Sequence, residues 1–176
     1  MEKANAKEKV GGSNNKNAYL LFMIFCYLVP ILIVYFYYDS HHSISSIICN
    51  NKHKYVILFF MCLMGFGTIL YEVERKDKFS TILITLLLFC LYGLIFINEK
   101  SILHFIFSFL TFAFIISFMI RHYILTKYNT VLLISLLFET LVALYSVIQL
   151  QKNIFFSEVI LLANFAFYFI YLHFLQ

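Results

Sequence analysis

Six long runs of apolar residues constrain the fold of this chain more than any other feature of its sequence. Each run is close to the roughly 20 residues that an α-helix needs to cross about 30 Å of hydrocarbon. An unpaired backbone amide or carbonyl is costly inside a bilayer, and the runs lack the alternation of a membrane β-strand, so we predict helices. The predicted membrane-spanning helices cover residues 18–38, 54–71, 79–97, 102–120, 130–150 and 154–175.

The composition supports this interpretation and excludes several classes of protein. Of the 176 residues, 62% are hydrophobic and only 12% are charged, whereas a soluble domain carries about 25% charged residues. A soluble enzyme, a nucleic-acid-binding module and a disulfide-stabilised secreted domain are therefore excluded.

The lengths of the connections predict how the helices are arranged. Most connections are short, so sequential helices should be antiparallel neighbours in an all-α, up-and-down bundle of six transmembrane helices over 18–176. The connection 39–53 is long enough to have its own structure. Residues 1–17 are polar and lack periodicity, and we expect a flexible tail there. The mixed-sign segment 72–78 is predicted to be a solvated connection.

The distribution of basic residues predicts the orientation of the bundle. Nine of the 13 Lys and Arg residues lie in the N-terminal tail and in the connections 72–78 and 121–129, and four lie on the other side. Because cytoplasmic loops carry an excess of Lys and Arg, both termini are predicted to be cytoplasmic.

Glu139 is the outstanding polar residue within the predicted spans, because an ionisable side chain at bilayer depth usually has a partner or a function. Ser135, Ala143 and Ser146 share its helical face, which should point into the bundle. Asn164 lies at a similar depth in the last span, and we predict a hydrogen bond between it and Glu139. Glu139 then either carries a proton or cation, or is a protonated group that holds two helices together.

Two further polar features lie in the fourth and sixth predicted spans. His104, Ser108 and Thr111 form a stripe on the fourth span, which either lines a hydrophilic path beside Glu139 or makes hydrogen bonds between helices. Glu158 lies about one turn inside the last span. We expect it to reach the interface or to meet Lys152.

One stretch resembles a family of small six-span bacterial membrane proteins, a domain family of unknown function that is distantly similar to the Frag/DRAM/Sfk-type proteins of eukaryotes. The resemblance covers roughly residues 40–120. The matching positions are Ser43, Ser45, Lys54, Gly65, Tyr71 and the Leu103-His104 pair. The chain departs from the pattern at Ile47-Ile48-Cys49-Asn50, where the family has tyrosines and a proline, and at Lys54, where it has arginine. The resemblance implies six spans and a membrane location, and it brings no established activity.

These features favour a non-enzymatic, accessory or structural membrane component. The chain has no paired carboxylates on one membrane face, no Ser/His/Asp arrangement and no CxxC or HExxH motif, so we predict no catalytic residue, metal or cofactor. The expected partners are the lipid bilayer and other membrane proteins or a second copy of the chain, and no nucleic acid. An alternative is a small transporter or channel that uses Glu139 as a proton or cation site, with Asn164, Ser135 and His104 lining the path. A third hypothesis is an intramembrane enzyme that uses His104 and Glu139.

Overall fold

The computed structural model describes residues 2–37, 43–50, 52–98, 101–149 and 154–175. The described residues form seven α-helices and no strand: α1 (Glu2–Phe36), α2 (Ile44–Asn50), α3 (Lys54–Glu74), α4 (Lys78–Phe96), α5 (Ile102–Leu125), α6 (Thr130–Gln149) and α7 (Ile154–Leu175). Five helices are long and apolar enough to cross a membrane, and α6 adds a shorter apolar stretch, Thr130–Ser146. The predicted all-α polytopic bundle is confirmed.

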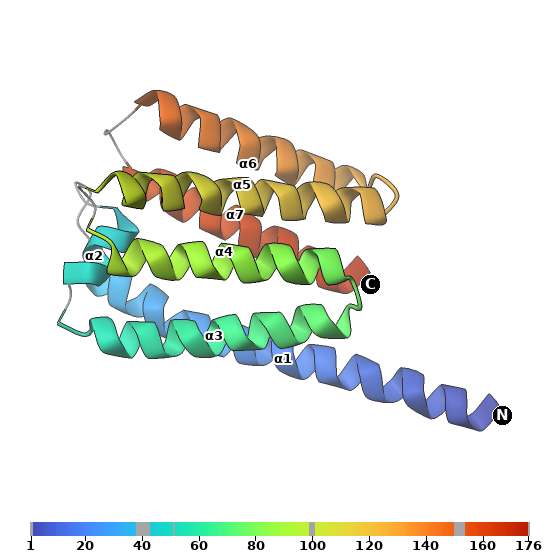
Figure 1. Ribbon diagram of the computed structural model, residues 1–176. Coiled ribbons are helices and arrows are strands. Elements are labelled where there is room, and N and C mark those ends of the chain that lie inside the picture. The colour runs from blue at the N-terminus through green and yellow to red at the C-terminus, as the bar shows by residue number, and fades with distance from the viewer. Residues whose placement is uncertain (1, 38–42, 51, 99–100, 150–153, 176) are drawn as a thin grey trace.

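The long helices form an up-and-down bundle in which neighbours in the sequence are neighbours in space. Helices α3, α4, α5 and α6 follow one another across the bundle (Figure 1). Helix α1 packs against α3, and α7 packs against α6 and α5, but α1 and α7 do not pack against each other in the described part of the chain. Helix α1 begins and α7 ends at the same end of the bundle (Figure 1). The assignment of that end to the cytoplasm stays a prediction.

The two segments outside the predicted spans have regular structure. The long connection contains α2, which covers the end of the bundle opposite the termini and contacts α1, α3, α4 and α7 (Figure 1). Residues 2–17 are helical, because α1 begins at Glu2, and the flexibility predicted for residues 1–17 stays a prediction. Residues 2–9 are rich in Ala, Glu and Lys, which are strong helix formers and can extend a helix that is already present.

The short connection between α3 and α4 is closed by local hydrogen bonds and a tight turn. The Asp77 carboxylate accepts a hydrogen bond from the Phe79 amide at 3.2 Å and caps the start of α4. Lys76, which precedes Asp77 and follows the end of α3, has a left-handed backbone with a φ of 61°. Its amide donates to the Val73 carbonyl. This turn places the polar residues of 72–78 close to the ends of the neighbouring helices.

Two glycines allow α3 to approach its neighbours on both sides. A Cβ atom on Gly65 would overlap the Tyr92 hydroxyl and crowd Leu88 of α4. A Cβ atom on Gly67 would lie 2.9 Å from the Phe22 ring of α1. Small residues at helix interfaces permit this close packing, which is a main source of helix association in lipid.

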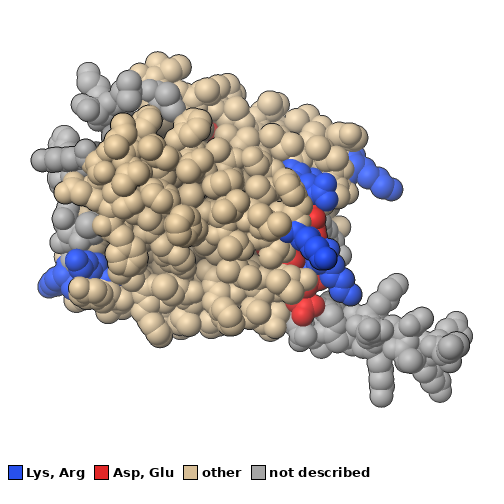
Figure 2. Space-filling view, in the orientation of Figure 1, with Lys and Arg blue, Asp and Glu red and all other residues tan. Residues whose placement is uncertain are grey.

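The outer surface of the bundle is apolar along its length and charged at its ends. Large hydrophobic side chains such as Phe25, Phe59, Phe89, Phe109 and Leu141 are more than half exposed. On the face that Figure 2 shows, Lys, Arg, Asp and Glu gather at the end with the α3–α4 turn, a few basic side chains lie at the other end, and the surface between is uncharged. A soluble protein would cover such an apolar surface, whereas lipid chains solvate it.

Candidate functional site

Glu139 and Asn164 form the hydrogen bond that the sequence predicts. The Asn164 amide nitrogen donates to Glu139 Oε2 at 2.7 Å and to the Ser135 carbonyl at 2.9 Å, and Asn164 Oδ1 accepts from the Ser135 hydroxyl at 2.9 Å. The Glu139 side chain is fully buried, and its Oε1 atom has no hydrogen-bond partner among the described residues. These three residues therefore connect α6 to α7 in the interior.

His104 does not join these three residues. Its Nε2 atom lies 3.3 Å from the Ser45 hydroxyl of α2, and its Nδ1 atom lies 3.1 Å from the Ile97 carbonyl. The described residues include no hydrogen bond between His104 and Glu139, Asn164 or Ser135. The path that the transport hypothesis assigned to all four residues is therefore not formed by contacts among them.

Most positions of the family resemblance fall at the two ends of the bundle, and Gly65 lies midway along α3. Ser43, Ser45 and His104 lie together, with the two serine hydroxyls 3.0 Å apart. Lys54 begins α3 at the same end. Tyr71 lies near the other end of α3, and its hydroxyl is 2.6 Å from Nδ1 of His173 on α7.

The prediction that residues 72–78 form a solvated connection is wrong for Glu72 and Arg75. Their side chains are 0% and 2% exposed, and Arg75 Nη1 donates to Glu72 Oε1 at 2.7 Å. The guanidinium carbon also lies 4.6 Å from the centre of the Tyr71 ring and 4.8 Å from that of Phe169 on α7. Burying these charges is tolerable because they neutralise each other, and the guanidinium stacks on two aromatic rings.

A second group of hydrogen bonds lies between this cluster and the surface, and His122 Nε2 is 4.0 Å from Glu72 Oε2. The Ser80 hydroxyl donates to Asp77 Oδ2 at 2.8 Å and lies 2.9 Å from His122 Nε2. Because the single hydroxyl proton of Ser80 is used by Asp77, His122 Nε2 must donate to the Ser80 oxygen. Arg121 Nε donates to the same Asp77 oxygen at 3.0 Å.

The bonds around Asp77 explain its acidity. Partial burial would raise the pKa of the Asp77 carboxyl, but the hydrogen bonds from Arg121 and Ser80 and the positive charge of Arg121 hold it below its usual value of 3.8. We call the whole cluster the charged network; it consists of Tyr71, Glu72, Arg75, Asp77, Ser80, Arg121, His122 and His173.

A cavity of about 690 Å³ lies where α1 and α7 diverge. Its walls come from α1 and α7, its floor comes from α4 and α5 with Met61 of α3, and α2 covers one end. Nearly all the lining side chains are aliphatic or aromatic. Ser108 and Thr111, two members of the stripe on the fourth span, also line it, although Thr111 uses its hydroxyl proton on the Phe107 carbonyl.

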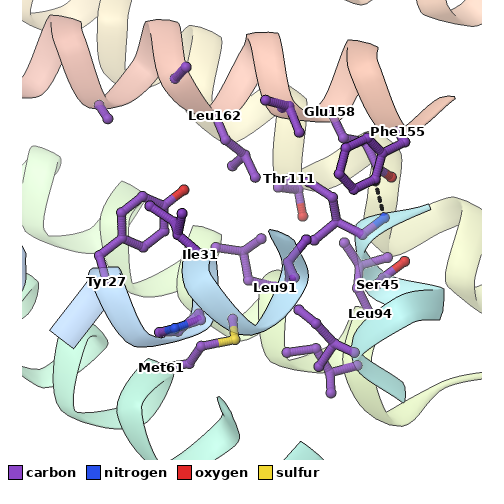
Figure 3. Close-up of a pocket in the computed structure, with 18 of the residues that line it drawn as sticks. Tyr27, Ile31, Ser45, Met61, Leu91, Leu94, Thr111, Phe155, Glu158 and Leu162 are labelled. Carbon is purple, nitrogen blue, oxygen red and sulfur yellow. Dashed lines mark hydrogen bonds between the residues drawn. The ribbon is translucent and has the colours of Figure 1, made fainter. Parts of the chain in front are cut away.

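Glu158 is the one carboxylate among the described residues that line the cavity. It lies with Ser45 near the α2 end of the cavity, whereas Tyr27 lies toward the other end (Figure 3). Glu158 Oε2 accepts a hydrogen bond from the Ile44 amide at 2.6 Å, at the start of α2. The partner expected for Glu158, Lys152, lies outside the described residues.

Sequence reasoning missed the charged network and the cavity. The i,i+3 spacing of Glu72 and Arg75 at the end of an apolar run was an available signal for an ion pair. His122 and His173 both lie in the last turn of their helices at the same end of the bundle. No comparable signal marks the cavity, since its apolar lining has the same composition as a lipid-facing surface.

Comparisons of the chain with protein-family models, with curated proteins and with solved structures give no match. The resemblance to small six-span bacterial membrane proteins therefore stays a prediction.

Proposed function

We propose that this chain is a non-enzymatic membrane protein that binds a single-chain amphipathic lipid in the cavity between α1 and α7. The observation that carries the proposal is the cavity itself, which is apolar along its length and has a carboxylate near one end. Its volume of about 690 Å³ lies within the roughly 300–1,000 Å³ typical of ligand sites.

The length of the cavity suits one acyl chain. Its lining residues on α7 run from Phe155 to Ile170, which is about 22 Å of helix at about 1.5 Å per residue. One leaflet of a bilayer is about 15 Å deep, half of the hydrocarbon core. An extended chain that fills one leaflet would therefore fit along the groove.

The position of the cavity favours a ligand that comes from the bilayer. The described residues of α1 and α7 do not pack against each other, so the groove between them lies beside the surrounding hydrocarbon. A lipid could enter sideways between these two helices without crossing water. Since a lipid chain is already in an apolar solvent, its transfer gains little hydrophobic energy, and binding must rely on packing and on the polar end.

Photo-crosslinking tests this proposal. The purified chain in lipid nanodiscs is mixed with a single-chain alcohol that carries a photoactivatable group in its tail, and mass spectrometry locates the labelled residues. Labels should concentrate on the cavity-facing positions of α1, α5 and α7. Ala166→Phe, which fills part of the cavity, should remove most of this labelling.

Ala18→Phe provides the matched control. Ala18 is exposed on α1 and does not line the cavity, so the same added volume there should leave labelling unchanged. Labelling spread evenly over the outer surface, with no difference between the two variants, would contradict the proposal.

A further inference from the structure

We propose that the cavity prefers lipids with a positively charged amine head over lipids with a neutral or anionic head, and that Glu158 makes this distinction. The inference rests on the proposed function, because it names the class of ligand for the same cavity. It depends on the polar atoms at the α2 end of the cavity. It also depends on Glu158 Oε1, which has no partner among the described residues.

The lining residues present acceptors and hydroxyls but no cation. The described lining contains Glu158, the hydroxyls of Ser45, Ser108 and Thr111, and those of Tyr27 and Tyr35, and no Lys or Arg is among these described residues. His104 is not one of the described lining residues, and its Nε2 atom lies 3.3 Å from the hydroxyl of Ser45, which is. A phosphate or carboxylate head would therefore meet a like charge and no countercharge from the described lining.

Glu158 has only part of its bonding capacity satisfied by the protein. A carboxylate can accept about four hydrogen bonds, and the single bond of Glu158 in the described residues is the 2.6 Å bond from the Ile44 amide to Oε2. Its Oε1 atom has no protein partner among them, and the residue lines the cavity. An ammonium group there would provide both the missing donor and the missing positive charge.

The two fully buried glutamates of the described chain show how it treats a carboxylate without a ligand. Glu72 is paired with the guanidinium of Arg75, and Glu139 accepts from the side-chain amide of Asn164. Both partners come from side chains of the protein. Glu158 differs from both, because its one hydrogen bond among the described residues comes from a backbone amide and the residue lines the cavity, where a donor from outside the chain can reach it.

The test compares three photoactivatable probes with the same tail and different heads: a primary amine, an alcohol and a carboxylate. Binding of each to the chain in nanodiscs of neutral lipid is measured by saturation of cavity labelling. In the native chain the amine should bind at least about tenfold more tightly than the carboxylate, as expected for a charged hydrogen bond. Equal affinity for the amine and the carboxylate overturns the inference without any variant.

Glu158→Gln assigns the preference to this side chain. Glutamine keeps an oxygen acceptor for the Ile44 amide and removes the negative charge. Affinity for the amine should fall about tenfold or more, whereas affinity for the alcohol should stay the same. An unchanged affinity of Glu158→Gln for the amine would contradict the assignment of the amine preference to Glu158.

The alcohol probe separates this inference from the proposed function. Cavity labelling by all three probes with similar affinity leaves lipid binding in place and overturns the amine preference. Absence of cavity labelling by every probe overturns both. If Glu158→Gln unfolds the chain, the comparison of amine and carboxylate in the native protein still decides the question of preference.

Discussion

The two ends of this bundle treat a glutamate carboxylate in opposite ways. At the end with the termini, Glu72 is held by Arg75 within the charged network. At the α2 end, Glu158 has one backbone donor and faces a cavity. The countercharge of Arg75 neutralises Glu72 from within the protein, although Glu72 Oε2 and Arg75 Nε have no hydrogen-bond partner among the described residues. A carboxylate beside a cavity can instead be neutralised by a ligand.

The same difference appears in the packing of the helices. At the end with the termini, Tyr71 of α3 reaches Phe169 and His173 of α7, with ring centres 5.2 and 5.7 Å apart. At the other end α1 and α7 have no such connection in the described residues, and α2 covers the space between the helices. Contacts of the charged network therefore join α3 to α7 at the end with the termini. The cavity lies between α1 and α7, and α2 covers it at the other end.

The largest expected effect follows from removal of the Arg75 charge. Arg75→Met should destabilise the folded chain by about 3–5 kcal/mol, because it leaves Glu72 buried without a countercharge. Unfolding by SDS titration in mild detergent measures the change. The double variant Glu72→Gln/Arg75→Met should recover part of the loss, because it also removes the stranded charge. If the single variant is as stable as the native chain, Arg75 does not neutralise Glu72 in the folded state.

The sequence predicted the α6–α7 contact and missed the charged network for a physical reason. Glu139 and Asn164 lie at matching depth in two adjacent spans joined by a short connection, so helical geometry alone brings them together. The network instead combines Glu72 of α3 with His122 of α5 and Arg75 with Phe169 of α7. These contacts depend on which non-sequential helices pack together, and the periodicity of a single span does not contain that information.

The spans and the cavity show the same contrast between local and tertiary information. Run length predicted the six helices to within a few residues at most ends, because the bilayer imposes that length. The cavity depends on the divergence of α1 and α7, and residues such as Leu162 would be apolar whether they faced lipid, a neighbouring helix or a ligand. The role of Glu158 could not be separated from anchoring for the same reason.

Asn164→Leu should have the second-largest effect. The substitution removes three hydrogen bonds between α6 and α7 and leaves Glu139 with no partner, so we expect a loss of about 1–3 kcal/mol. Ser117→Ala is the control, because the Ser117 hydroxyl donates only to the Ala113 carbonyl of its own helix. SDS titration of both variants should show a clear loss in the first and almost none in the second. Equal stability would mean that the α6–α7 bonds add nothing to packing.

Glu158→Gln should cost less than about 1 kcal/mol in stability, since the amide oxygen can still accept the hydrogen bond from Ile44. This small cost is what separates the α2 end from the charged network, where loss of one charge strands another. The measurement is the same SDS titration, on the protein without added lipid probe. A loss as large as that of Arg75→Met would show that Glu158 has an internal countercharge, and the contrast between the two ends would disappear.

The smallest expected effect is a dependence on acid at the charged end. The pKa of the Asp77 carboxyl is lower in the folded chain than its usual 3.8, so the unfolded chain takes up a proton at this residue first as the pH falls. The stabilisation by Asp77 is therefore complete well above pH 3.8 and is lost as the pH falls through the folded-state pKa. Asparagine is also a good helix cap, so Asp77→Asn should keep the cap of α4 while it removes this titration. Unfolding curves of the two proteins should converge as the pH is lowered below 3.8, because the native chain alone loses the contribution of a charged Asp77. Parallel curves would mean that the bonds from Arg121 and Ser80 do not favour the ionised carboxylate, and that the network ends at His122 rather than at the surface.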